Sequence, residues 1–328
     1  MDLQYLNPAK GFYLKELERF LKESGLDFDP GCTFTVNALE NDEIIATGSL
    51  EKNVLKCIAV SENHQGEGLS ATIITALRSK AFDNGEEHLF LFTKPKNIDM
   101  FGGLGFYPVA KTQDALLMES VRGGCDSFVA ALPKKEGVCG AVVANCNPFT
   151  LGHRYLMEQA AKQVDWLYVF VLSEDKSLFP ADVRYELVKK GTADIPNIIV
   201  CPTGKYMISS ATFPTYFIKD KTKVDDIKCD MDIEVFSKKF APALGITRRF
   251  VGTEPHSVVT NAYNQRLQKL LPDRGIELTI IERKTASGAP ISASRVRKLI
   301  EENDREALRE LLPETTLEYV DKHFFAEK

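Results

Sequence analysis

Apolar and amphipathic segments alternate strictly along the second part of the chain. Three continuous apolar runs are separated by segments whose apolar residues recur at helical spacing. Such runs are typical of strands buried on both faces of a parallel sheet. The expected strands are 138–144, 166–172, 198–201, 250–251 and 277–281, the expected helices are 152–162 and 181–190, and three short helices are expected within 292–324. This order predicts an α/β fold with a doubly wound, Rossmann-like parallel sheet.

The first part of the chain has a different order of elements. The pattern predicts a helix at 11–24, strands at 33–39, 44–50 and 54–60, a helix at 69–84 and a strand at 88–93. Several strands in succession before the next helix are typical of an α+β domain. The two patterns meet at a polar stretch that begins with Pro133 and ends with Gly137. We therefore expect domains at 1–132 and 138–328, joined by a linker at 133–137.

Composition narrows the class of protein. The 328 residues fit about two domains, and 41 basic against 46 acidic residues give a net charge of -5. A net negative charge repels the phosphates of nucleic acids and anionic membranes, so nonspecific binding to either is not expected. The 7 cysteines are irregularly spaced without a CxxC pair, so neither a disulfide framework nor a zinc site is indicated. The chain has no signal-like start and no apolar run of about 20 residues, so we expect a cytoplasmic protein.

The loop after the first strand of the second domain carries candidate chemistry. Residues 145–153 read NCNPFTLGH and lead directly into a helix. A Gly at this junction, here Gly152, lets a phosphate approach backbone N–H groups at the positive end of the helix. His153 can then point a ring N–H at the same phosphate. The alternative is an ordinary helix start, with Thr150 as the N-cap and a satisfied His.

A second helix start is unusually cationic. Residues 291–297 read ISASRVR, with Ser292 as the expected cap and Arg295 and Arg297 soon after it. Cations at a helix amino terminus oppose the helix dipole unless an anion lies between them. Ser hydroxyls and Arg guanidinium groups both bind phosphate oxygens, so we expect an anion site here. The alternative is an ordinary capped helix whose Arg side chains are solvated.

These two segments together resemble the nucleotidyltransferase superfamily. TLGH followed downstream by ISASRVR is similar to its T/HxGH and ISSTxxR pair, although many members have His where Thr150 stands. Residues 173–184 resemble the family segment in which a Lys meets the ATP phosphates, which gives that role to Lys176. The resemblance implies His153, Lys176 and Arg297 as catalytic residues. It implies ATP contacts from Asn147, Phe149, Thr150, Gly152, Gly252, Ser292, Ser294 and Arg295.

A closer resemblance is to the citrate lyase ligase family. The matching segments are 145–153, 209–214, 251–255, 263–264 and 291–297. This resemblance implies an enzyme that uses ATP and Mg²⁺ to acetylate the thiol of a phosphoribosyl-dephospho-CoA arm on the citrate lyase acyl carrier subunit. Acetate is the expected substrate, AMP and pyrophosphate are the expected products, and no protein-held metal site is implied.

The first domain contains a glycine-rich segment between a strand and a helix. Residues 65–71 read QGEGLSA, which satisfies GxGxxA, but the preceding strands form no βαβ unit, so a dinucleotide site is weakly supported. The segment better resembles the pyrophosphate loop of GNAT acyltransferases, and 97–107 resembles a later GNAT segment. Gln65, Gly66 and Gly68 are then candidate contacts to a CoA-like arm. His64 and Glu62 are expected to be solvated, and no catalytic base is evident.

Other functions are compatible with the same motifs. A cofactor-biosynthetic adenylyltransferase would use His153 and Arg297 to pass AMP to a phosphate on a nucleotide or pantetheine. A CoA- or nucleotide-binding regulator without catalysis is a further alternative, and the first domain can be a scaffold that retains the GNAT fold without acetyl transfer. Residues 209–214 and the fused first domain favour ligation, both on resemblance.

Overall fold

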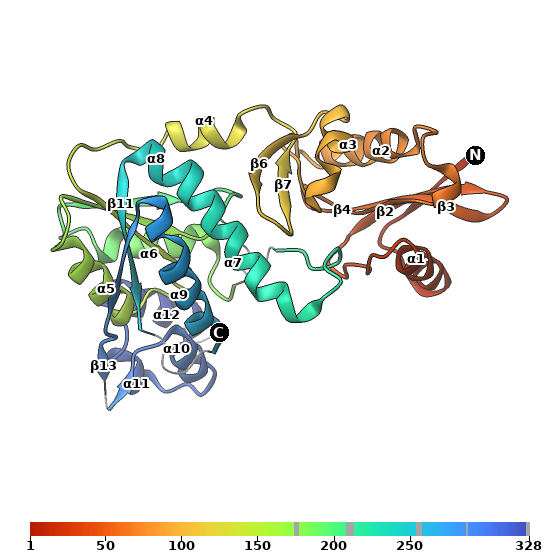
Figure 1. The fold of residues 1–328 in the computed structure, drawn as a ribbon. Helices are drawn as coiled ribbons and strands as arrows, with labels where there is room; N and C mark the ends of the chain where they lie inside the picture. Colours follow the sequence, from red (N-terminus) through yellow and green to blue (C-terminus); the bar gives the residue numbers. More distant parts are fainter. Residues whose placement is uncertain (174–176, 208–212, 254–257, 287, 326–328) are drawn as a thin grey trace. The chain divides into compact units, whose positions relative to one another are not determined.

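The computed structural model describes residues 1–173, 177–207, 213–253, 258–286 and 288–325. The chain divides into two compact units (Figure 1). Unit 1 comprises Met1–Gly124 and Phe213–Glu234, and unit 2 comprises Cys125–Thr212 and Val235–Lys328. Each unit therefore contains two separate stretches of sequence. Among the described residues, no helix is both long enough and apolar enough to cross a bilayer.

Unit 1 is built on a mixed sheet in the order β1-β2-β3-β4-β5-β7-β6. The strands are β1 (Asp2–Leu6), β2 (Phe34–Glu40), β3 (Glu43–Glu51), β4 (Val54–Val60), β5 (Phe90–Thr93), β6 (Tyr107–Lys111) and β7 (Leu116–Glu119). Neighbouring strands are antiparallel except β4 and β5, which are parallel and pair only at their beginnings, Val54 with Phe90 and Leu55 with Leu91. Beyond Leu55 the two strands share no ladder pairs, which leaves backbone at their carboxyl ends available to a ligand.

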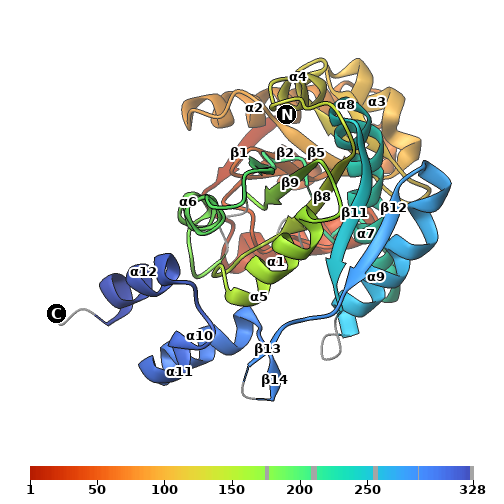
Figure 2. The ribbon, with the colours of Figure 1, turned by 90° about the vertical axis from the view of Figure 1, so that its left-hand side faces the viewer.

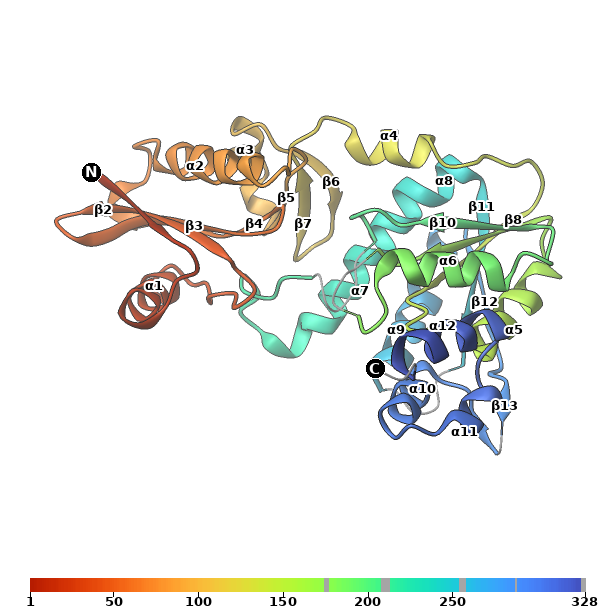
Figure 3. The ribbon, with the colours of Figure 1, turned by 180° about the vertical axis from the view of Figure 1, so that it is seen from behind.

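Two helices cover opposite faces of this sheet, α1 (Gly11–Glu23) and α2 (Leu69–Asp83) (Figures 1 and 3). A short helix, α3 (Ile98–Gly103), follows β5. Helix α2 packs very closely on β3, because a Cβ added at Gly48 would lie 2.5 Å from Cγ2 of Ile73. The glycine therefore sets the depth at which α2 sits on the sheet.

Residues 213–234 pack in unit 1 although they follow the third strand of unit 2. The buried Tyr216 hydroxyl donates a hydrogen bond to the carbonyl of Phe92 at 3.0 Å, and the Asp27 N–H donates to the carbonyl of Tyr216 at 2.9 Å. The Phe213 ring meets Phe92 edge to face at 5.5 Å. This segment leads into α7 (Val224–Val235). Its place in unit 1 differs from the expected domain at 138–328, because its burial partners lie far away in the sequence.

Unit 2 contains a fully parallel sheet in the order β10-β9-β8-β11-β12. Its strands are β8 (Cys139–Ala144), β9 (Trp166–Val171), β10 (Ile198–Pro202), β11 (Ile246–Gly252) and β12 (Glu277–Ile281), beside a hairpin of β13 (Thr285–Ala286) and β14 (Ala289–Pro290). Its helices are α5 (Leu151–Ala161), α6 (Ala181–Gly191), α8 (Ala241–Leu244), α9 (Val258–Leu270), α10 (Ala293–Glu301), α11 (Arg305–Arg309) and α12 (Glu314–Phe324), with a π-helical turn at Phe236–Phe240. Helix α4 (Gly124–Ala130) begins where unit 1 ends. The expected fold class is confirmed in both units.

The strand order of unit 2 fixes where a ligand can bind. From β8 the sheet grows through α5 and α6 in one direction and through α8 and α9 in the other. Right-handed crossovers place these helix pairs on opposite faces, and Figure 2 shows α5 and α6 on one side of the strands and α9 on the other. The connections diverge between β8 and β11. The crevice beyond the carboxyl ends of these two strands is therefore the topological switch point.

Candidate active site

A cavity of about 710 Å³ opens at this switch point in unit 2. Its walls come from the ends of β8, β11 and β12, the first turns of α5 and α10, and the middle of α9. The sequence-predicted residues Thr150, Gly152, His153, Gly252, Ser292 and Ser294 all line it. The fold thus brings the starts of α5 and α10 to one cavity, because β8 and β12, the sheet strands that precede them, end at the same edge of the sheet.

The first turn of α5 holds the His153 ring in a defined orientation. The His153 N–H donates to Thr150 Oγ1 at 3.3 Å, and the Thr150 N–H donates back to Nδ1 of His153 at 3.2 Å. Thr150 Oγ1 also lies 2.9 Å from Nδ1. Because Nδ1 accepts a backbone hydrogen bond, the proton of a neutral ring sits on Nε2. The capping box therefore leaves His153 with a single N–H to offer.

The charge state of His153 follows from its surroundings. Burial, reinforced by the positive charge of Arg283, lowers the pKa of His153 to about 4. The ring is therefore neutral at pH 7 and acts as a hydrogen-bond donor through Nε2 without adding a full charge. The ordinary helix start and the ring donor, which were alternatives from the sequence, are compatible in this one residue.

Gly152 allows the second helix start to approach. A Cβ added at Gly152 would lie 2.9 Å from the carbonyl oxygen of Ile291 and 3.2 Å from its Cβ. Any side chain at this position would push the segment before α10 away from α5. The glycine is needed here for close packing of two backbones, in addition to any contact with a phosphate.

The two arginines of α10 have partners on neighbouring loops. Arg297 donates through Nη1 to the carbonyl of Asn147 at 2.6 Å and through Nη2 to Ser294 Oγ at 3.1 Å. The Arg295 N–H is capped by Ser292 Oγ at 3.2 Å, and its guanidinium donates to the carbonyl of Ala286 at 3.2 Å. Both guanidinium groups are half-buried and lie outside the set of cavity-lining residues.

Asn147 and Phe149 lie behind the cavity wall. Asn147 Oδ1 accepts a hydrogen bond from the Phe179 N–H at 3.1 Å, which ties the loop after β8 to the loop after β9. The Phe149 side chain is fully buried in the core of unit 2, and its ring lies parallel to that of His153 with centroids 6.2 Å apart. Neither side chain is among those that line the cavity. Their observed contacts position the loop and the His153 ring.

Arg184 connects the loop after β8 to the loop after β9. It is fully buried, and it donates to the carbonyls of Phe179, Asn145 and Leu172 at 3.0, 2.8 and 2.8 Å, and also to Asn145 Oδ1. A buried guanidinium surrounded by carbonyl oxygens fixes the ends of two strands relative to each other. The sequence signal was present, since Arg184 ends the 173–184 segment, but no role had been assigned to it.

Further cavity residues were missed by the sequence analysis. Arg283 follows β12 and supplies a cation to the cavity wall, and Asn264 from α9 is buried there with Nδ2 donating to the carbonyl of Gly252 at 3.0 Å. Arg283 could have been found, because β12 was expected to end at Ile281 and ligands bind beyond strand ends. Tyr263 and Asn264 were noted as part of a family segment without a role.

Several residues of interest lie outside the described part of the chain. They are the predicted catalytic Lys176, residues 209–212 of the ligation segment, and residues 254 and 255. Lys176 keeps its place as a prediction.

Unit 1 has its own cavity, of about 1100 Å³, where β4 and β5 diverge. The sequence-predicted Gln65, Gly66 and Gly68 line it, close to the start of α2. Gly66 and Gly68 have φ of +89° and +78°, a conformation that glycine adopts without strain. The N–H groups of Ala71 and Thr72 bond the carbonyl of Gly68, so the first N–H groups of α2 remain for a ligand. This geometry can hold an anion.

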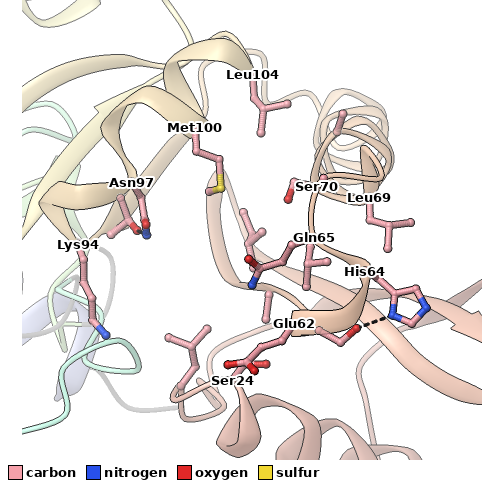
Figure 4. A pocket seen from close by; sticks show the side chains of 18 of the residues that line it. Ser24, Glu62, His64, Gln65, Leu69, Ser70, Lys94, Asn97, Met100 and Leu104 are labelled. Atoms are coloured by element: carbon pink, nitrogen blue, oxygen red, sulfur yellow. Dashed lines mark hydrogen bonds between the residues drawn. The ribbon is translucent and has the colours of Figure 1, made fainter.

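The ring of His64 in the same wall is bonded at both nitrogens. Nδ1 lies 2.8 Å from Ser61 Oγ, and Nε2 lies 3.2 Å from Glu40 Oε2 (Figure 4 shows the His64 side of the cavity). The expectation that His64 is solvated is wrong, because its ring bridges β2 to the loop after β4. Glu62 is exposed, as expected.

Two known protein families match different parts of the chain. The family model for the citrate lyase ligase C-terminal domain matches residues 139–320, and the acetyltransferase (GNAT) family model matches residues 3–106. The [citrate [pro-3S]-lyase] ligase of Klebsiella pneumoniae is 42% identical over 93% of this chain and 91% of its own length. The corresponding ligase of Escherichia coli K12 is 40% identical over 94% and 90%, and that of Haemophilus influenzae is 38% identical over 94% and 95%. The chain therefore belongs to the citrate lyase ligase family.

Proposed function

We propose that this chain is an ATP-dependent ligase that acetylates the prosthetic-group thiol of the citrate lyase acyl carrier subunit. Acetate is first activated as acetyl-adenylate, and the thiol of the phosphoribosyl-dephospho-CoA arm then takes the acetyl group. AMP and pyrophosphate are released. Family membership over nearly the whole length of the curated relatives supports this activity.

The orientation of His153 carries the proposal for where the chemistry occurs. ATP lies over the loop 145–153, with its phosphates against the first turn of α5 and the Nε2–H of His153. An oxygen of acetate attacks the α-phosphorus, and the bond to pyrophosphate breaks. The added charge develops on phosphate oxygens, which a fixed neutral donor and the nearby Arg283 stabilise without a protein nucleophile.

The second half-reaction takes place at the acetyl carbon of the acetyl-adenylate. The thiol sulfur attacks the acetyl carbon, its proton is lost, and the bond to the AMP oxygen breaks. Catalysis in both steps is electrostatic and positional.

Mg²⁺ is assigned chiefly to the triphosphate. Among the described residues, no group of three or more His, Cys, Asp and Glu side chains is arranged to hold a metal ion. Phosphate oxygens and water supply the hard ligands that Mg²⁺ prefers. The ion would neutralise charge on the departing pyrophosphate.

Lys176 and Arg297 complete the proposed phosphate contacts. Lys176 is assigned to the ATP phosphates by family resemblance. Arg297 keeps the Asn147 carbonyl in place and lies beside Ser294 of the cavity wall, so a shift of this side chain is needed before it touches phosphate. Its first contribution is to position the loop.

The test is ATP–pyrophosphate exchange without carrier protein, run with a panel of carboxylates and nucleotide phosphates. A ligase exchanges label only when acetate is present. Exchange that depends on a nucleotide or pantetheine phosphate would select the adenylyltransferase, and no exchange with any substrate would select a regulator.

The cavity of unit 1 is assigned to the CoA-derived arm of the carrier. The segment 65–68 and the first turn of α2 accept its diphosphate, and the gap between β4 and β5 accepts its extended chain. The GNAT family match supports this assignment.

A further inference from the structure

Two lysines line the unit 1 cavity, and a third lies next to its wall. Lys94 and Lys96 follow β5 and line the cavity, and Figure 4 shows Lys94 across the cavity from Gln65 and His64. Lys219 comes from the segment 213–234, and its Cε would lie 3.3 Å from a Cβ added at Gly25, next to the cavity-lining Ser24. The cluster is therefore assembled from two distant parts of the sequence.

These lysines have no partner among the described residues. The nearby Lys221 is paired with Asp27 at 2.5 Å and Lys223 with Asp220 at 4.0 Å, whereas no hydrogen bond or ion pair in the described part of the chain engages Lys94, Lys96 or Lys219. Like charges held together without a counterion repel one another. Their proximity is unfavourable in the free protein and becomes favourable when an anion binds.

The electrostatic balance at Lys94 is positive. Partial burial, together with the charges of Lys219 and Lys96, lowers the pKa of Lys94. Glu23 and Glu62 also line the cavity, whereas Lys219 and Lys96 are the charges that shift the pKa of Lys94. The side of the cavity that holds these lysines therefore attracts a phosphate.

We propose that Lys94, Lys96 and Lys219 form a second phosphate site in the unit 1 cavity, separate from the diphosphate site at 65–68. The inference rests on the proposal that this cavity receives the CoA-derived arm. The cavity thus favours a ligand that carries one phosphate in addition to the diphosphate bound at 65–68. That phosphate belongs to the ribose end of the arm.

The test is calorimetric binding at low salt of CoA and of dephospho-CoA, which differ by one ribose phosphate. The full-length protein is compared with the double variant Lys94→Met, Lys96→Met. The control is the double variant Lys15→Met, Lys111→Met, which removes two exposed lysines of unit 1 that do not line the cavity. Methionine keeps the length of the side chain and removes its charge.

We expect the cavity variant to lose at least about tenfold in affinity for CoA, the effect of one charge-assisted hydrogen bond, and to lose less in affinity for dephospho-CoA. The control variant should bind both probes like the wild type. Affinities of the cavity variant for both probes within twofold of the wild type, or no binding by the wild type, would overturn the proposal.

Acetate-dependent pyrophosphate exchange is measured on the same proteins, because it needs no arm. Exchange should stay within twofold of the wild type in the cavity variant. Normal exchange with unaltered binding would refute the second phosphate site alone, whereas absence of exchange in the wild type would refute the proposed ligase activity.

Discussion

The guanidinium of Arg297 donates a hydrogen bond to the carbonyl oxygen of Asn147 at 2.6 Å, joining residues 150 positions apart. The bond links the start of α10 to the loop after β8. A second donor of the same side chain reaches Ser294 Oγ at 3.1 Å. Because one planar group serves both acceptors, its geometry fixes the loop after β8 relative to the start of α10.

Arg297→Lys should therefore reduce acetate-dependent exchange by about tenfold or more, because an ammonium cannot serve both acceptors with the same geometry. The loss should appear in kcat/KM for ATP, whereas the Tm should stay close to that of the wild type. The control is Lys298→Met, which changes the neighbouring exposed cation of the same helix, 73% exposed. Equal kinetics for Arg297→Lys and the wild type would contradict the positioning role.

His153→Ala should reduce exchange by about 10² or more, the scale for losing one preorganised donor to a developing charge. Unit 2 should remain folded, because Thr150 Oγ1 still accepts the hydrogen bond from the backbone N–H of residue 153. Kinetics and circular dichroism on the same preparation separate the two effects. A variant that exchanges normally, or that unfolds, would show a purely structural role.

The lowered pKa of His153 predicts a pH dependence of stability. The folded state has a pKa of about 4 and the unfolded chain about 6.5, so the unfolded state binds more protons between these values. Stability from this group is fully present above pH 6.5 and falls as the pH drops toward 4, by about 3 kcal/mol at most. Urea unfolding at pH 7 and pH 4.5 should show this loss in the wild type and less of it in His153→Gln. Identical losses in both proteins would place the effect elsewhere.

Gly152→Ala should destabilise unit 2 by about 1–3 kcal/mol and impair exchange, because the new Cβ would lie 2.9 Å from the Ile291 carbonyl. Gly102→Ala is the control, since a Cβ at Gly102 meets nothing within 4 Å. Urea unfolding of the two variants tests the difference. Equal stability would mean that the segment before α10 shifts at no cost.

Gly68→Glu should leave acetate-dependent exchange intact and reduce acetyl transfer to the carrier thiol by about tenfold or more, because a carboxylate would occupy the place of a phosphate. Gly68 has φ of +78°, so any side chain there strains the backbone, and the control variant must introduce the same strain. Gly85→Glu has the same strain at φ of +81°, with nothing within 4 Å of its Cβ. Unimpaired carrier acetylation by Gly68→Glu would remove the 65–68 loop from the arm site.

The sequence by itself determined the class of fold and the two helix starts of unit 2. Long apolar runs and helical spacing are local properties, and the boundaries of β8, α5 and β12 follow from them within about one residue. The motifs around His153 and Arg297 could be recognised in the sequence, because Gly, Ser and Arg at a helix start affect how that helix end binds an anion. The ligand-binding end of the sheet followed from the order of strands and helices.

Only the tertiary structure decided which side chains share a cavity and which support it. Phe149 lies in the core, Arg297 bonds a loop carbonyl, Arg184 joins the ends of two strands, and Arg283 lines the cavity. The clearest case is the segment 213–234, whose Tyr216 bonds Phe92 in unit 1 although unit 2 surrounds it in sequence. Hydrophobic burial depends on which distant surfaces meet, and no periodicity within a short segment encodes that partner.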